Sequence, residues 1–179
     1  MLTHEEISGI IVTLNGENKP YHFKVKAKDE RDIDCYFAPD KEAQVSTLYK
    51  KCVRVGGTTS KNQKCTSIDA VYIEMLTSEE MSNIGRYELL KPVTFDVSYD
   101  MENSLWCIQN YDLALDGYGS TYNEAIECLE EDIESHVLCF TRCDDSEQSQ
   151  DSLNVKRKLL EHINFNQVLA YLYERDGEI

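Results

Sequence analysis

The stretch VTFDVSYDMENSLWCIQNYDLALDGYGSTYNEA, residues 93–125, decides the fold of the second half of this chain. Residues 93–100 alternate apolar and polar side chains, which is typical of a strand with one buried face. The turn-forming run 100–103 follows, so residues 104–111 are expected to return as the second strand of a hairpin. Residues 113–119 predict a third strand. The stretch therefore indicates a small antiparallel sheet.

An amphipathic helix is expected directly after the third strand. Thr121 and Glu124 have the spacing of a capping box, in which each side chain accepts a backbone N–H of the other residue. Apolar residues then recur every three or four positions through residue 140, which predicts one apolar stripe that packs on the sheet. The opposite face is expected to carry Glu127, Glu130, Glu131 and Glu134.

Residues 93–140 resemble the HicB-like antitoxin domain. The resemblance is carried by the hairpin FDVSYDMENSLW and by GYGSTYNEA, residues 117–125, in which glycines precede a threonine-capped acidic helix with an early alanine. It implies a partial ribonuclease-H-like module of sheet and helix that lacks catalytic carboxylates. It also implies a role in a toxin–antitoxin system, because members of that family neutralise a small basic ribonuclease toxin by covering its active surface.

The C-terminal residues depart from that family. Many members add a helix-turn-helix or ribbon-helix-helix segment that binds operator DNA, whereas residues 153–179 have only one short basic patch, at 156–158. Residues 144–152 are purely polar and predict a loop. An amphipathic helix over 153–163 and a short final helix are expected after it. Autoregulation through DNA is therefore not expected of this chain.

The first half predicts a small β-barrel. Residues 6–14, 20–27 and 32–38 are β-rich, residues 40–51 have helical spacing, and residues 52–57 and 65–76 again indicate strands. Three strands, a helix and two strands follow one another in an OB-fold. We therefore expect an α+β protein, with an OB-like β-barrel domain in 1–78 and an acidic HicB-like domain in 91–179. Residues 79–90 are expected to form a connector with a short helix capped by Thr77 and Glu80 and ended by Gly85.

Composition bounds the class and the compartment. The 179 residues are 41% hydrophobic and 28% charged, as in a globular protein. No apolar run reaches the roughly 18 residues of a membrane span, and the start MLTHEEISGI lacks the pattern of a secretory signal. The seven scattered cysteines form no CxxC pair and are expected to be free thiols. We expect a cytoplasmic protein without membrane contact.

The negative charge is concentrated in the second half. The net charge is −15; residues 1–90 hold 12 lysines and arginines against 14 acidic residues, whereas residues 91–179 hold 6 against 19. An acidic surface attracts basic partners and repels nucleic acid. We therefore expect this half to mask a basic protein partner, such as a small toxin. The candidate partner-binding residues are Trp106, Asp112, Asp116, Tyr118, Glu127, Glu130, Glu131 and Glu134.

Two alternatives bear on those candidates. Trp106 could instead pack under the helix that begins near residue 121, since tryptophan is mostly buried. The barrel could bind single-stranded nucleic acid through a basic face, for which the candidates are His22, Lys24, Lys26, Lys50, Lys51 and Arg54. That half is not net basic, however, and lysines are also ordinary surface residues. Homo-oligomerisation is left open.

Catalysis and cofactors are not indicated. The sequence has no phosphate-binding loop, and its four histidines lie in no nucleophile motif. His136, Cys139 and Cys143 have spacing that places them near one side of a helix, but the usual cysteine pair is missing, and His162 or Cys128 would have to complete a zinc site. We therefore expect a non-catalytic binding protein with no cofactor.

Overall fold

The structure is a computed structural model that describes residues 3–15, 21–62, 65–143 and 148–177. Its fold is α+β, as the sequence predicts. The chain divides into two compact units, Met1–Thr77 with Ser98–Ser104, and Ser78–Val97 with Leu105–Ile179. No helix among the described residues has the length and apolar character that a membrane crossing requires.

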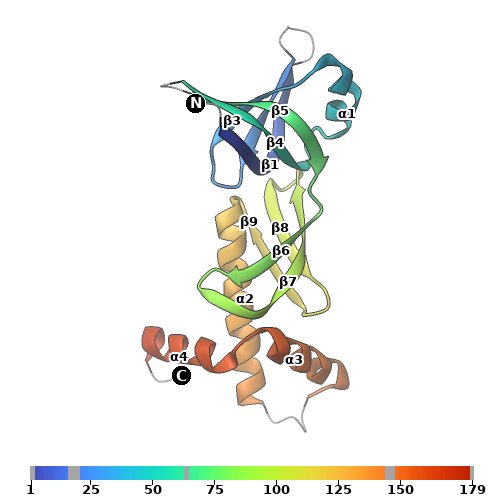
Figure 1. The fold of residues 1–179 in the computed structure, drawn as a ribbon. Helices are drawn as coiled ribbons and strands as arrows, with labels where there is room; N and C mark the ends of the chain where they lie inside the picture. Colours follow the sequence, from blue (N-terminus) through green and yellow to red (C-terminus); the bar gives the residue numbers. More distant parts are fainter. Residues whose placement is uncertain (1–2, 16–20, 63–64, 144–147, 178–179) are drawn as a thin grey trace. The chain divides into compact units, whose positions relative to one another are not determined.

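The first unit is a closed five-stranded β-barrel (Figure 1). Its elements are β1 (Thr3–Asn15), β2 (His22–Ala27), β3 (Asp32–Tyr36), η1 (Pro39–Lys41), α1 (Glu42–Thr47), β4 (Cys52–Asn62) and β5 (Cys65–Met75). The strand order is β1-β2-β3-β5-β4, and antiparallel pairing of β4 with β1 closes the barrel. β3 and β5 pair in parallel, and α1 follows β3 in the chain. This architecture confirms the expected OB-like barrel.

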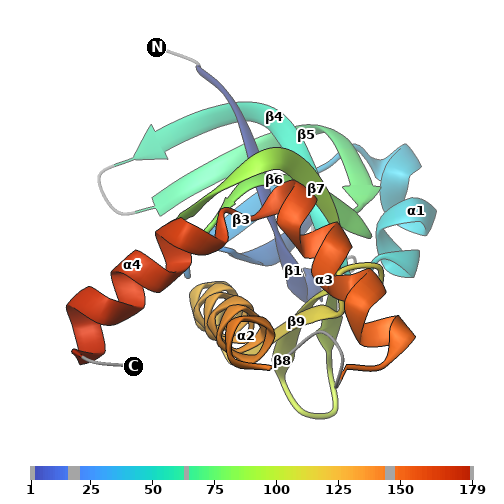
Figure 2. The same ribbon diagram turned by 90° about the horizontal axis from the view of Figure 1, so that it is seen from below.

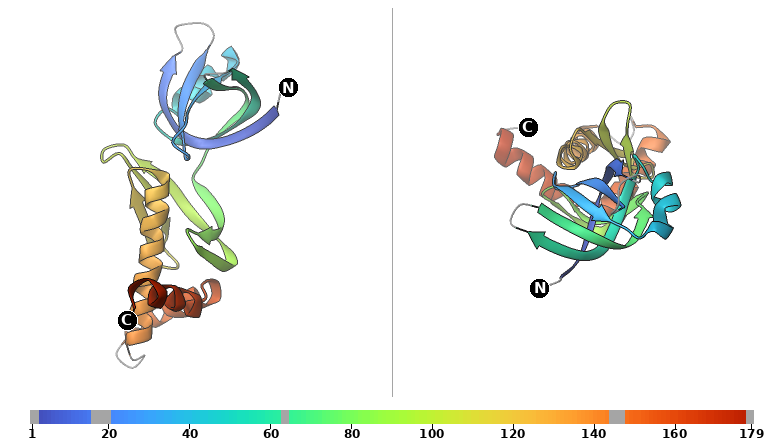
Figure 3. Two further views of the ribbon diagram at one scale, coloured as in Figure 1. Left: turned by 90° about the vertical axis from the view of Figure 1, so that its left-hand side faces the viewer. Right: turned by 90° about the horizontal axis from the view of Figure 1, so that it is seen from above.

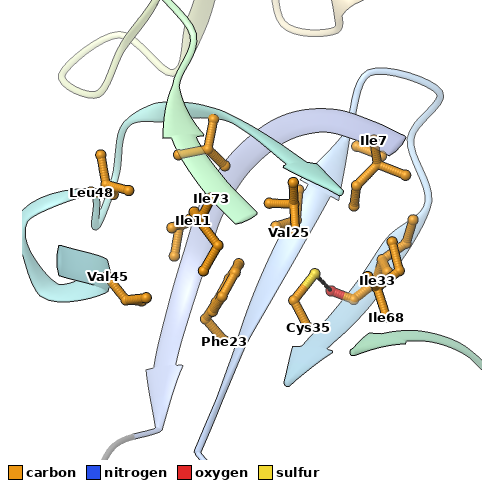
Figure 4. Packing of buried hydrophobic residues seen from close by; sticks show 13 residues of the cluster. Ile7, Ile11, Phe23, Val25, Ile33, Cys35, Val45, Leu48, Ile68 and Ile73 are labelled. Atoms are coloured by element: carbon orange, nitrogen blue, oxygen red, sulfur yellow. Dashed lines mark hydrogen bonds between the residues drawn. The ribbon is translucent and has the colours of Figure 1, made fainter. Parts of the chain in front are cut away.

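The barrel interior is built from alternate residues of its strands. On β2, Phe23 and Val25 are buried, while the side chains between them are partly exposed, as the alternation predicts. Figure 4 shows these side chains in one cluster with Val45 of α1 and with Leu48, which directly follows that helix. The helix therefore completes the apolar core.

One buried thiol belongs to this cluster. Cys35 of β3 is fully buried, and its Sγ donates to the carbonyl of Ile33 at 3.9 Å (Figure 4). Burial, and secondarily the charge of Asp34, raise the pKa of Cys35 to about 12. The side chain is thus a small apolar core residue at ordinary pH.

The second unit is a four-stranded antiparallel sheet with three helices (Figures 1 and 3). The strands β6 (Ser78–Ile84), β7 (Tyr87–Asp100), β8 (Leu105–Asn110) and β9 (Leu115–Gly119) are adjacent in that order. The helices are α2 (Tyr122–Arg142), α3 (Gln150–His162) and α4 (Phe165–Asp176). Figure 2, which looks along α2, shows α3 and α4 on the same side of it as β6 and β7.

Glycines let α2 pack directly on β9. A Cβ atom at Gly117 would lie 2.2 Å from the carbonyl oxygen of Ala125, and one at Gly119 would lie 2.3 Å from the Ala125 nitrogen. The capping box is also present, because Thr121 accepts from the Glu124 N–H and the Glu124 carboxylate accepts from the Thr121 N–H. The residues 117–125 singled out in the sequence therefore fix where α2 starts and how closely it approaches the sheet.

The helix expected in residues 77–90 was a wrong prediction. Residues 78–84 form β6, and Gly85 and Arg86 make a two-residue turn into β7, with Ile84 opposite Tyr87. Gly85 has a φ of 53°, so it serves the turn and does not end a helix. A register shift between Met81 and Asn83 places Met81 and Ile84 both inward, so capping and stop residues stood here beside a bulged strand and not a helix.

The C-terminal segment is more helical than expected. α3 begins at Gln150, capped by the Ser149 side chain, inside the range 144–152 that the sequence predicts as a loop. Residues 144–147 of that range lie outside the described residues. α4 is the expected final helix, and Asn164 caps its start.

Candidate partner-binding face

The turn between β8 and β9 is held in a defined shape. The Asn110 side chain hydrogen-bonds both the neighbouring strand β7 and the turn. Its Nδ2 donates to the Thr94 carbonyl at 2.9 Å, and its Oδ1 accepts the Leu113 N–H at 2.9 Å. Ala114 has a φ of 51°, which is strained for a residue with a Cβ atom. Its carbonyl lies 2.9 Å from His136 Nε2 of α2. The turn is therefore fixed from the sheet and from the helix.

This turn stands beside a chain of hydrogen-bonded polar side chains on the sheet. The Tyr111 hydroxyl donates to Gln109 Oε1 at 3.1 Å, Gln109 Nε2 donates to the Tyr118 hydroxyl, and Tyr118 donates to Asp116 Oδ2 at 3.2 Å. Tyr111 is 78% exposed and Tyr118 is 40% exposed. We call these four residues, Gln109, Tyr111, Asp116 and Tyr118, the tyrosine face.

Strand alternation explains why this face is open. Leu115, Gly117 and Gly119 are buried, and the two glycines approach α2, so the side chains of Asp116 and Tyr118 project from the opposite side of the sheet. Partial burial, and then the charge and hydrogen bond of Asp116, raise the pKa of Tyr118. The tyrosine therefore remains a neutral hydrogen-bond donor at physiological pH.

A hollow of about 460 Å³ borders the same turn. It is lined by residues of β7, the β8–β9 turn and α3: Pro92, Val93, Thr94, Asn110, Asp112, Leu113, Lys158, Glu161 and His162. We call it the Asp112 hollow. Lys158 Nζ donates to Asp112 Oδ1 at 2.9 Å, and this bond and charge lower the pKa of Asp112. A smaller hollow of about 270 Å³ lies on the other side of the turn, lined in part by Tyr111 and Asp116.

Trp106 does not belong to the exposed face. It is 2% exposed, and its ring packs edge-on against Tyr122 in the first turn of α2, with the centroids 5.3 Å apart. Trp106 lies opposite Gly119, on the sheet face that α2 covers. Trp106 therefore packs under α2, as the alternative in the sequence analysis had it. Its prediction as an exposed partner-binding residue was wrong.

Glu130 and Glu134 are also corrected, because both are buried. Glu130, 5% exposed, accepts from the backbone N–H, Nε and Nη2 of Arg86 at 2.8, 2.6 and 3.2 Å. Glu134, 6% exposed, accepts from the Tyr87 hydroxyl at 2.8 Å and from Arg175 at 2.9 Å. These carboxylates tie the β6–β7 turn and α4 to α2.

The remaining candidates of the acidic half separate into two places. Asp116 and Tyr118 are hydrogen-bonded to each other on the tyrosine face, and Asp112 lines the Asp112 hollow at the β8–β9 turn. Glu127 and Glu131 are exposed on α2, but α2 covers the other side of the sheet from Tyr118. A single contact surface therefore cannot be centred on all five.

Several basic candidates of the barrel lie beside acidic residues, and two of them, Lys26 and Arg54, form ion pairs. Lys24 and Lys26 lie opposite Asp34 and Asp32 across β2 and β3, and Lys26 also pairs with Glu30 at 3.2 Å. The six candidates thus form no continuous positive groove.

The other candidates for nucleic-acid binding are Arg54, the two lysines before β4, and His22. Arg54 lies 3.4 Å from Glu6 and 3.3 Å from Glu74. Lys50 and Lys51 are exposed just before β4. His22 of β2 contacts the ring of Tyr36 of β3, with 5.7 Å between the ring centroids.

No group of three or more metal-ligating side chains is assembled within the described parts of the chain. The ring of His136 stacks on Phe140 at 5.6 Å, and Nε2 contacts the Ala114 carbonyl. Cys139 and Cys143 are exposed free thiols.

Tyr111 and Gln109 are the members of the tyrosine face that sequence reasoning did not single out. Tyr111 was placed in the strand 104–111, whereas β8 ends at Asn110. Asparagine favours turns, so Asn110 was the signal that could have placed Tyr111 outside the strand. No protein-family model and no curated protein sequence matches this chain, so known proteins add no candidate residues.

Proposed function

We propose that this chain is a non-catalytic binding protein that covers a basic protein partner with its tyrosine face. The observation that carries the proposal is the exposed, hydrogen-bonded chain from Tyr111 to Asp116. Tyrosines held in place by such bonds lose little conformational entropy on binding. The carboxylates of Asp112 and Asp116 supply charge complementary to a basic surface.

The resemblance to HicB-like antitoxins supports the nature of the partner. The elements that carried it, the hairpin, the two glycines and the capped helix, are all present in the fold. A partner of that kind is a small basic ribonuclease toxin. The six described cysteines are free thiols, which supports a cytoplasmic setting for the complex.

Affinity purification with matched variants tests the proposal. The tagged full chain is used to capture proteins from lysate of the native host, and the captured proteins are identified and quantified. Tyr111→Ala should lower the recovery of one basic protein, since loss of a central aromatic contact costs about 2 kcal/mol, or about 30-fold in affinity. Asp116→Asn should make that recovery less sensitive to salt.

The control is Glu127→Gln, an exposed carboxylate away from the tyrosine face. It should leave recovery of the partner unchanged. Equal recovery with wild type and Tyr111→Ala, or recovery of acidic proteins alone, would contradict the proposal. Circular dichroism of each variant establishes that the fold is retained.

A second candidate is single-stranded nucleic-acid binding by the barrel. It is favoured by the OB-like strand order and by the His22–Tyr36 pair on the β2–β3 face, where OB-folds bind oligonucleotides. The pairing of Arg54 with Glu6 and Glu74 opposes it. Fluorescence anisotropy with a labelled oligothymidylate tests it. Binding that weakens with Tyr36→Ala but not with Tyr49→Ala would support the candidate, and no binding at low salt would exclude it.

A further inference from the structure

The Asp112 hollow offers hydrogen-bond acceptors that the protein does not use fully. Asn110 is already engaged through both its amide nitrogen and its oxygen. Asp112 receives one bond, from Lys158 to Oδ1, and Glu161 adds a second carboxylate to the lining.

The other walls of the hollow are apolar. Val93 and Leu113 are buried and line it together with Pro92. The volume of about 460 Å³ is within the roughly 300–1,000 Å³ of pockets that hold small ligands. A matching ligand has an aliphatic stem and a head group that only donates hydrogen bonds. Arginine has this chemistry, since its guanidinium carries five donors and no acceptor.

We propose that the Asp112 hollow binds an arginine side chain of the partner, which replaces Lys158 as the counter-ion of Asp112. This inference rests on the proposed function, because it assigns a chemical class to one contact of the same basic partner. The guanidinium bonds the Asp112 carboxylate, and its stem lies along Val93 and Leu113. Remaining donors are directed to Glu161.

Lys158 acts in the unbound chain as an internal substitute for that arginine. Its contact with Asp112 is a surface ion pair, with the side chains 50% and 84% exposed. Such pairs are weak, so an incoming guanidinium with two parallel bonds can displace the ammonium. Removing the lysine should therefore improve binding, which a purely structural role for Lys158 would not produce.

Nuclear magnetic resonance titration of the full chain tests the inference. The probe is N-acetyl-L-arginine methylamide, and the matched control is the corresponding citrulline derivative, which has the same length but no charge. The arginine probe should shift the backbone signals of residues 92–94, 110–113 and 158–162 and the His162 ring nitrogen signals. Equal shifts with both probes, or arginine shifts only outside these residues, would overturn the inference.

Three variants sharpen the test. Asp112→Asn should abolish saturable binding of the arginine probe, and Glu127→Gln should not change it. Lys158→Met keeps the stem and removes the charge, so the probe should bind about two- to fivefold more tightly, the range expected from a surface ion pair. Weaker binding by Lys158→Met would contradict the displacement model.

The two proposals can fail separately. If the arginine probe does not bind but Tyr111→Ala still reduces partner recovery, the hollow is wrong and the tyrosine face stands. If the probe binds at the hollow and partner recovery is independent of Tyr111 and Asp116, the proposed function is wrong and the hollow is a separate arginine site.

Discussion

Replacing Glu130 by glutamine should destabilise the second unit by about 2–3 kcal/mol. The Glu130 carboxylate accepts three N–H groups of Arg86, and hydrogen bonds to charged groups contribute about 1.5–3 kcal/mol each. Loss of one partner of a fully buried pair costs about 3–5 kcal/mol. Arg86 is 41% exposed at its side chain, so water can replace part of the lost contact and the cost should be smaller.

Urea denaturation followed by tryptophan fluorescence measures this effect. Trp106 is the only tryptophan of the chain and is buried in the second unit, so its fluorescence reports that unit. The control is Glu131→Gln, the next residue of the same helix, which is exposed and should change the free energy of unfolding by less than about 0.5 kcal/mol. If the two variants were equally stable, the argument that Glu130 is a structural carboxylate would be refuted.

Three further predictions concern other contacts. Gly117→Ala should destabilise the second unit by about 1–3 kcal/mol in the same urea assay, because its Cβ atom would collide with the backbone of α2; an unchanged midpoint would mean that α2 is not packed this closely. Thr121→Ala should cost about 1 kcal/mol through loss of the helix cap, and Thr121→Ser should restore most of it. The raised pKa of Cys35 favours the neutral thiol in the folded state. The contribution of Cys35 to the free energy of unfolding should therefore be complete below pH 9 and be lost as the pH rises towards 12. At pH 10 the free energy of unfolding should have fallen by about 1.4 kcal/mol more in the wild type than in Cys35→Val. Denaturation followed by circular dichroism measures it. If the free energies of unfolding of the two proteins changed with pH in parallel, the prediction would be contradicted.

Local sequence signals predicted the elements that depend on neighbouring residues. The alternation on β2 and the capping box at Thr121 were both confirmed, because each follows from a few consecutive side chains.

Contacts between distant segments could not be predicted in this way. Glu130 and Glu134 lie beside the apolar stripe of α2, and a helical pattern alone does not show whether that flank is covered. It is covered because Arg86 of the β6–β7 turn binds Glu130, and because Tyr87 of β7 and Arg175 of α4 bind Glu134. Of the candidate site residues, Asp112, Asp116 and Tyr118 are exposed as expected of surface residues, whereas Trp106 is buried under α2.

The open edge of β9 determines whether another chain can add a strand to this sheet. β9 is a terminal strand of an open sheet, and such strands commonly accept an extra strand from a partner or from another copy. Here Asp132 of α2 accepts the Asp116 N–H at 3.0 Å, and the Ala114 carbonyl is engaged by His136. One backbone donor of β9 and the carbonyl just before the strand are therefore already occupied. β-augmentation at β9 is therefore disfavoured, which also protects the chain against edge-to-edge aggregation. Recognition at this end of the sheet has to proceed through side chains, so single substitutions can retune its specificity without altering the fold.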